Sequence, residues 1–162
     1  MAAPAGKRLG AVAATLAVVL AAAVGTWWLL RDPAPYALRK TPAVDVTVHA
    51  VTSDYPEAGE LAGDVDPLLK VYVQRLAAGD ATDLARLGAP WYTGRERAAR
   101  QLISRYGAQA GEPVDALVRD PVVPYLAAVE LRFGDGRRQE VRLTRDDDVW
   151  WLQLGDGDPV AP

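Results

Sequence analysis

The most pronounced pattern along the chain is an unbroken apolar run from Leu9 to Leu30, without a single charged side chain. Lys7 and Arg8 stand directly before it. A helix of this length spans roughly the 30 Å of a bilayer's hydrocarbon core. The pattern therefore predicts a transmembrane anchor over residues 9–30, preceded by a short cytoplasmic tail over residues 1–8.

The same run has a second interpretation as a cleaved secretory signal. Ala21 and Ala23 have the spacing of small residues that signal peptidase accepts, which would give a secreted protein after cleavage near Ala23. Cleavage there would leave an apolar stub at the start of the mature chain, so we favour retention. Trp27 and Trp28, near the end of the run, are placed where indoles prefer the membrane–water boundary.

The basic residues on either side of the apolar run bear on the orientation of the anchor. Lys7 and Arg8 on one side face Arg31, Arg39 and Lys40 on the other, so the count of basic residues does not decide it. Basic residues directly ahead of an apolar run resemble a signal-sequence n-region, which usually stays in the cytoplasm. We expect a cytoplasmic N-terminus and an extracytoplasmic C-terminal domain at the cell membrane; a cytosolic domain is the alternative.

Residues 31–42 carry no apolar period. Pro33, Pro35 and Pro42 favour a stiff, extended linker, at about 3.1 Å per residue, which would lift the following domain away from the bilayer.

A strand pattern follows in residues 43–65. Val44, Val46 and Val48 alternate with polar residues, which predicts a half-buried strand over 44–51. Proline, glycine and acidic residues then indicate a loop over 53–65. The sequence does not say where this added strand lies in a sheet.

Three helices are predicted next. The first begins at Asp66 and Pro67, a capping residue followed by proline at the first helical position, and ends at Gly79. Asp80 caps a short second helix. The third begins at Thr93, with Glu96 at the capping-box spacing, and ends before Gly107. The apolar positions expected to face a core are Leu69, Tyr72, Val73, Leu76, Leu102, Ile103 and Tyr106.

From Val114 onward the period changes to two. Segments 114–119 and 125–133 alternate, Gly134-Asp-Gly136 is typical of a hairpin turn, and the alternation resumes through Val141 and Leu143. Asp146 to Asp148 turns the chain again, before Trp150, Leu152 and Leu154. We predict an α+β fold with helices packed on an antiparallel meander.

The composition narrows the function classes. After Arg31 the chain has 15 Lys and Arg against 21 Asp and Glu, a net charge of −6, which disfavours a nucleic-acid partner. There is no cysteine, and hence no disulfide or thiolate metal site. Arginine outnumbers lysine 15 to 3, which is typical of a GC-rich genome such as an actinobacterium's.

The order of these elements resembles the nuclear transport factor two-like, cystatin-like cone fold, over about residues 66–155. The residues that carry the resemblance are Leu69, Tyr72, Val73, Leu76, Gly79, Asp80, Leu84 and Trp150. Similar domains behind one N-terminal span occur in mammalian-cell-entry-associated membrane proteins and in scaffold subunits of conjugative type IV secretion systems. The resemblance implies a curved, cone-like sheet and an accessory or assembly role, with a tail over 156–162.

The same fold also occurs in isomerases and cyclases, so the fold alone does not exclude a catalytic function. Tyr72, Trp91 and Tyr106 are the candidate residues to line a pocket, with Asp83 or Asp115 as a base. We interpret these aromatics as core residues and the two aspartates as caps or turns.

The remaining candidates for chemistry are weak. The single histidine, His49, is expected on the exposed side of its strand, and Asp146 to Asp148 is a solvated turn rather than a calcium site. We predict no catalytic residue, no cofactor and no metal.

One feature points to a binding surface. If Trp150 is in the core, then Trp151 lies on the opposite face with Val149 and Gln153. We therefore favour a non-catalytic interaction domain on a single-pass anchor, with a protein partner or a second copy. The alternative for Trp151 is that the strand over 44–51, or the loop after it, covers this face. The alternative function is a ligand-binding or enzymatic cone.

Overall fold

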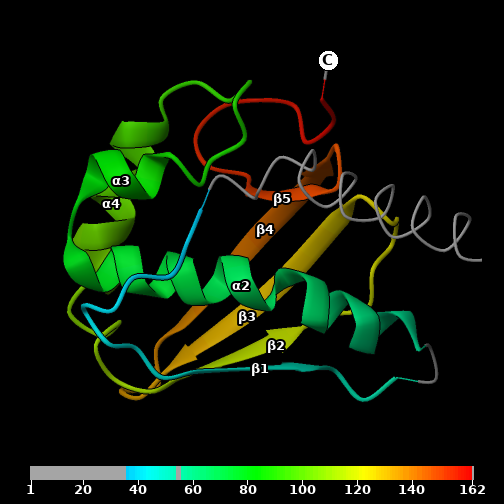
Figure 1. Cartoon of the computed structure of the whole chain (residues 1–162), viewed down its shortest axis with the longest axis horizontal. Coiled ribbons are helices and arrows are strands. Elements are labelled where there is room, and N and C mark those ends of the chain that lie inside the picture. Colours follow the sequence, from blue (N-terminus) through cyan, green and yellow to red (C-terminus); the bar gives the residue numbers. More distant parts are fainter. Residues whose placement is uncertain (1–35, 54–55, 162) are drawn as a thin grey trace, which may run out of the picture. The chain divides into compact units, whose positions relative to one another are not determined.

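A five-stranded sheet organises the computed structural model, which describes residues 36–53 and 56–161. The strands lie in the order β1 Val46–Ala50, β2 Val114–Val118, β3 Leu126–Phe133, β4 Arg138–Asp146 and β5 Val149–Leu152 (Figure 1). From β2 to β5 the neighbours are antiparallel, which confirms the predicted meander. Asp147 and Asp148, which join β4 to β5, have positive φ.

The strand predicted over residues 44–51, whose position in the sheet the sequence did not predict, is β1. It pairs with β2 in parallel, with Val46 opposite Val114 and Ala50 opposite Val118. The sheet is therefore mixed, and not wholly antiparallel as expected. A parallel neighbour is possible here because helices, and not a hairpin, connect β1 to β2. Residues 43–65 are consequently part of the α+β domain and no separate addition to it.

Three helices complete the described residues: α2 Glu57–Ala78, α3 Ala81–Ala85 and α4 Arg95–Tyr106. Figure 1 shows α2 lying across one face of the sheet. The strand residues on this inner face are buried, among them Val118, Val129, Leu131 and Leu143, which are all 0% exposed. The apolar stripe of α2 packs on them through Leu69, Val73 and Leu76, also 0% exposed, as the helical period predicts.

The start of α2 corrects the sequence prediction. Residues 57–65 are helical and not a loop. Ala58, Leu61, Ala62 and Val65 recur at helical spacing and are at most 8% exposed, so burial of this stripe outweighs the low helix propensity of the neighbouring glycines. Glu57 and Glu60 in the first turn also interact favourably with the helix dipole.

Asp66 and Pro67 therefore do not begin the helix. Pro67 is inside α2, where it lacks the N–H that would bond to the carbonyl of Gly63. The Asp66 carboxylate binds the ammonium of Lys70 at 2.8 Å, one turn further along. The predicted end is correct, because Gly79 adopts the left-handed conformation with φ of 72° and its N–H bonds to the last turn.

The two later helices differ in how well their caps were predicted. Asp80 caps α3 as expected, since its carboxylate accepts from the backbone N–H groups of Thr82 and Asp83. The capping box at Thr93 is not formed. Gly94, with φ of 66°, precedes α4, and Thr93 instead forms backbone bonds with Asp156 in both directions. This long-range bridge uses the groups that a cap would need.

The predicted anchor, with Trp27, Trp28 and Ala23, lies outside the described residues. Among the residues that are described, no helix combines the length and the apolar character needed to cross a bilayer.

Candidate functional site

The first candidate is a pocket around Tyr72. This side chain is 1% exposed, and its hydroxyl accepts a hydrogen bond from Gln139 Nε2 at 2.6 Å, which ties α2 to β4. Burial raises the pKa of the Tyr72 phenol, and the hydrogen bond from Gln139 acts in the opposite direction. The recess that Tyr72 lines has a volume of about 110 Å³. Pockets for small ligands usually reach about 300–1,000 Å³.

The other two predicted pocket residues do not join Tyr72 in this recess. Tyr106 is half-buried and stacks on Phe133, with ring centroids 5.4 Å apart. The Trp91 indole donates to the carbonyl of Asp158 at 2.9 Å and meets Tyr92 edge-on. Trp91 therefore packs against the C-terminal segment, while Tyr72 and Tyr106 pack against the sheet.

Both candidate bases lie beside a basic side chain. Asp83, 5% exposed, lies 2.8 Å from an Arg39 guanidinium nitrogen and 3.4 Å from Nε of Arg75. Burial lowers the pKa of the Arg75 guanidinium, and the charge of Asp83 opposes that shift. Asp115 lies 3.1 Å from Nδ1 of His49 across β1 and β2, on the exposed side of the strand expected for this histidine. Neither aspartate lines the recess of Tyr72.

Asp83 belongs to a contact that the sequence analysis missed. Gln74, 3% exposed, accepts from the backbone N–H of Arg39 and donates to the carbonyls of Arg39 and Pro42, each at 2.7 Å. These bonds hold residues 39–42 against α2, across which the segment runs in Figure 1. The described part of the predicted linker is therefore attached to the domain. The sequence feature that could have indicated this contact is Gln74 itself, a polar amide side chain between the apolar residues Val73 and Leu76.

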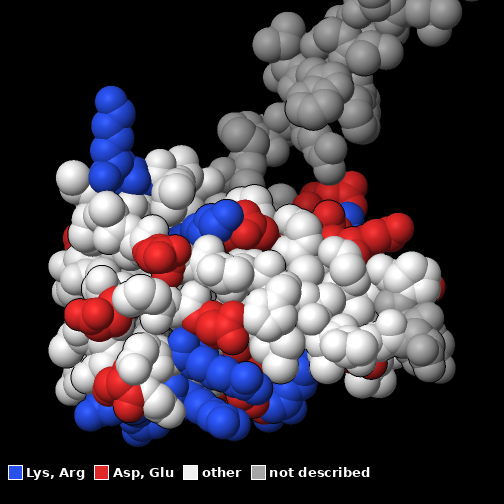
Figure 2. Space-filling model, turned by 90° about the horizontal axis from the view of Figure 1, so that it is seen from below, with Lys and Arg blue, Asp and Glu red and all other residues white. Residues whose placement is uncertain are grey.

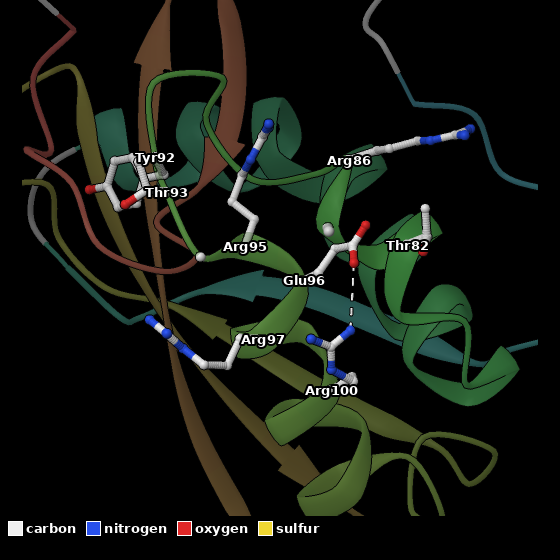
Figure 3. A pocket seen from close by; sticks show the side chains of 10 residues that line it. Thr82, Arg86, Tyr92, Thr93, Arg95, Glu96, Arg97 and Arg100 are labelled. Atoms are coloured by element: carbon white, nitrogen blue, oxygen red, sulfur yellow. Dashed lines mark ion pairs between the residues drawn. The ribbon is translucent and has the colours of Figure 1, made fainter.

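A larger recess, of about 550 Å³, lies between α3 and the start of α4 (Figure 3). Four arginines line it, a composition that attracts anions: Arg86, Arg95, Arg97 and Arg100.

The arginines of this recess do not converge on one point. Arg95 donates to the carbonyl of Gly88 at 3.1 Å. Arg97 lies 3.1 Å from Asp156, and Arg100 lies 3.5 Å from Glu96. Figure 3 shows the guanidinium groups of Arg86 and Arg97 pointing outward on opposite sides. The recess therefore has positive charge but no shared focus for a bound anion.

The predicted interaction residues Val149, Trp151 and Gln153 lie at the β5 edge of the sheet. Trp151 is half-buried and pairs with Thr144 of β4. The Thr144 hydroxyl donates to the carbonyl of Pro159, so the C-terminal segment passes over the sheet here. The strand β1 lies at the opposite edge and does not cover Trp151.

The outer face of the sheet is rich in ion pairs. Arg132 Nε lies 2.7 Å from Glu130, and Arg119 bridges Glu130 and Glu140. The hydrogen bond from Arg132 holds the pKa of the Glu130 carboxyl below its usual range. Figure 2 shows Lys and Arg gathered along the lower edge of that view, with acidic side chains among them. The pairing of opposite charges is typical of a solvated sheet face.

No group of three or more potential ligating side chains within residues 36–53 and 56–161 has the geometry of a metal site.

Family models, curated proteins and solved structures were compared with the chain, and none matches it.

Proposed function

We propose that this protein is a single-pass membrane protein whose α+β domain is a non-catalytic interaction module outside the cytoplasm, an accessory subunit of an envelope or transfer complex. The apolar run Leu9–Leu30 behind Lys7 and Arg8 supports the anchor. The helix-then-meander order supports a cone-like domain of the nuclear transport factor two-like type.

One observation carries the non-catalytic part of this proposal: side chains fill the space between α2 and the sheet. Enzymes of cone-like fold keep a ligand there, beside a carboxylate. Here Tyr72 and Gln139 close the space with their mutual hydrogen bond, and the nearby recess measures only about 110 Å³. The buried carboxylate of Asp83 is neutralised by Arg39 and Arg75 instead.

The segment before β1 also contacts β5. Burial raises the pKa of the Tyr36 phenol, and a hydrogen bond with the Trp150 backbone opposes that shift.

Membrane fractionation of the full chain with a C-terminal tag tests the anchor. We expect the protein to resist carbonate extraction, and protease added to intact spheroplasts to remove the tag. Replacing Val19 and Leu20 by arginine places two charges at the centre of the apolar run, at about 2.5–3.5 kcal/mol each, and should release the protein; Val19→Leu is the control. A carbonate-soluble or protease-protected wild-type chain would refute the proposed membrane topology.

A photo-crosslinking residue at position 151 tests the interaction role. We expect cross-links to a defined protein in membranes of the native host, and none from a control position at Ser104, which is exposed on α4. Equal labelling from both positions would argue against a specific surface.

A further inference from the structure

A third recess lies between the first turns of α2, the loop from β2 to β3, and β5. It has a volume of about 350 Å³. Its lining combines acidic and apolar residues: Glu57, Glu60, Leu61, Asp64, Pro121, Val122, Val123, Pro124, Arg145 and Trp150.

The acidic rim of this recess comes from α2. Glu57, Glu60 and Asp64 follow one another at helical spacing, and all three are exposed. None of them forms an ion pair with another described residue, in contrast to most acidic residues on the outer sheet face. The basic side chain in the recess, Arg145, is already 2.8 Å from Asp148 and lies over the Trp150 ring. The rim therefore carries negative charge that no described side chain neutralises.

The apolar part of the recess has two unusual features. Val122 is 95% exposed, and Tyr125, at the end of the same loop, is 42% exposed. Trp150, in the wall, is 3% exposed, and its indole Nε1 is buried without a hydrogen-bond acceptor. A buried donor without an acceptor costs free energy.

We propose that this recess binds a segment of a partner protein in which Lys or Arg alternates with apolar residues. The basic side chains pair with Glu57, Glu60 and Asp64, and the apolar side chains pack on Leu61 and Val122. The negative rim disfavours an acidic peptide and an anionic lipid surface alike. This inference rests on the proposed function, because it names the partner class of the interaction domain.

Peptide binding to the full chain in neutral detergent micelles tests the assignment. The probe is fluorescein-labelled Gly-Arg-Leu-Arg-Leu-Gly, measured by fluorescence anisotropy. The triple variant Glu57→Gln, Glu60→Gln, Asp64→Asn removes the three charges without changing side-chain size, and should weaken binding by about tenfold. Val122→Ser should also weaken it, and it leaves the core intact because Val122 is exposed.

Two control variants carry the same kinds of substitution at exposed positions outside the recess. Glu112→Gln removes an exposed acid outside the recess, and Val160→Ser removes an exposed valine on the C-terminal segment; both should bind the peptide as the wild type does. Peptides with glutamate in place of arginine, or serine in place of leucine, should bind weakly. Equal affinities for the triple variant and the wild type would overturn the proposal.

A second copy of the chain is the competing occupant. If the wild type is dimeric without peptide and the triple variant is monomeric in sedimentation analysis, the recess is a self-association site and the peptide assignment is wrong. If the peptide does not bind but cross-links from position 151 persist, only the assignment of this recess as a peptide-binding site is refuted. Loss of membrane attachment in the fractionation experiment refutes the proposed function instead.

Discussion

The attachment of residues 39–42 to α2 depends on one side chain, so Gln74→Leu should detach this segment from the domain. Leucine has a similar size and no polar atoms, and position 74 is only 3% exposed, so α2 should keep its packing. The substitution removes three hydrogen bonds, each 2.7 Å long, to the backbone of Arg39 and Pro42.

The size of the effect follows from these three bonds. A typical intramolecular hydrogen bond contributes about 0.5–1.5 kcal/mol net, and the freed backbone groups of a surface segment can turn to water. We therefore expect a loss near the lower limit, roughly 2 kcal/mol in total, or about a 30-fold shift toward the detached segment. The ion pair between Arg39 and Asp83 remains, but Arg39 is 59% exposed, so it contributes at most about 1 kcal/mol.

Hydrogen exchange of the Arg39 amide measures this shift, because that N–H donates to Gln74 in the folded domain. Its exchange should accelerate by about 30-fold in Gln74→Leu, with little change in the core amides, since the opening is local. Gln101→Leu, an exposed glutamine of α4, makes the same chemical change and should leave Arg39 protected. If Arg39 is protected in the wild type and exchanges no faster in Gln74→Leu, the attachment does not depend on this side chain.

Three further predictions concern the core and the outer face. Tyr72→Phe should lower the free energy of unfolding by about 1–3 kcal/mol in urea titrations, because buried Gln139 Nε2 loses its acceptor; no change would mean that the bond is absent. Burial raises the pKa of Tyr72 above 10, so the folded state holds this proton more tightly than the unfolded state. The contribution of Tyr72 to stability should thus be constant below pH 10 and fall as the pH rises further, a fall that Tyr72→Phe should reduce in thermal scans. Trp151→Ala should keep the domain folded yet reduce partner cross-linking, whereas Trp150→Ala, at a buried site, should cost about 3–5 kcal/mol; unfolding by Trp151→Ala would contradict an interface role.

Local patterns predicted the elements whose cause is also local. The stripe of Leu69, Val73 and Leu76 predicted the second half of α2, and the strand alternation predicted β2 to β5. Gly79 and Asp80 were correctly identified as caps because a left-handed residue and a capping carboxylate act within one turn.

The errors arose where a distant contact overrides a local preference. Gly59 and Gly63 favour a loop, yet burial of Leu61 and Val65 against the core makes this stretch helical. Thr93 has the spacing of a capping box, but its polar groups bond to Asp156, far along the chain.

The candidate sites depended on the tertiary structure to an even greater degree. The resemblance to the cone fold, which hosts enzymes, suggested Tyr72, Trp91 and Tyr106 as the lining of one pocket. The structure separates Trp91 from the other two and fills the space beside Tyr72. The acidic recess was not foreseen, since its rim lies in residues interpreted as a loop and its wall lies on a strand almost 90 residues away.

The sequence by itself determined the type and order of most secondary elements, the negative charge of the domain and the apolar N-terminal run. Only the tertiary structure decided that β1 pairs in parallel with β2, that Gln74 holds residues 39–42, and which side chains surround each recess. The reason is physical. Periodicity and capping depend on neighbours within a few residues, whereas strand pairing and recesses depend on the mutual fit of surfaces that are far apart in the chain.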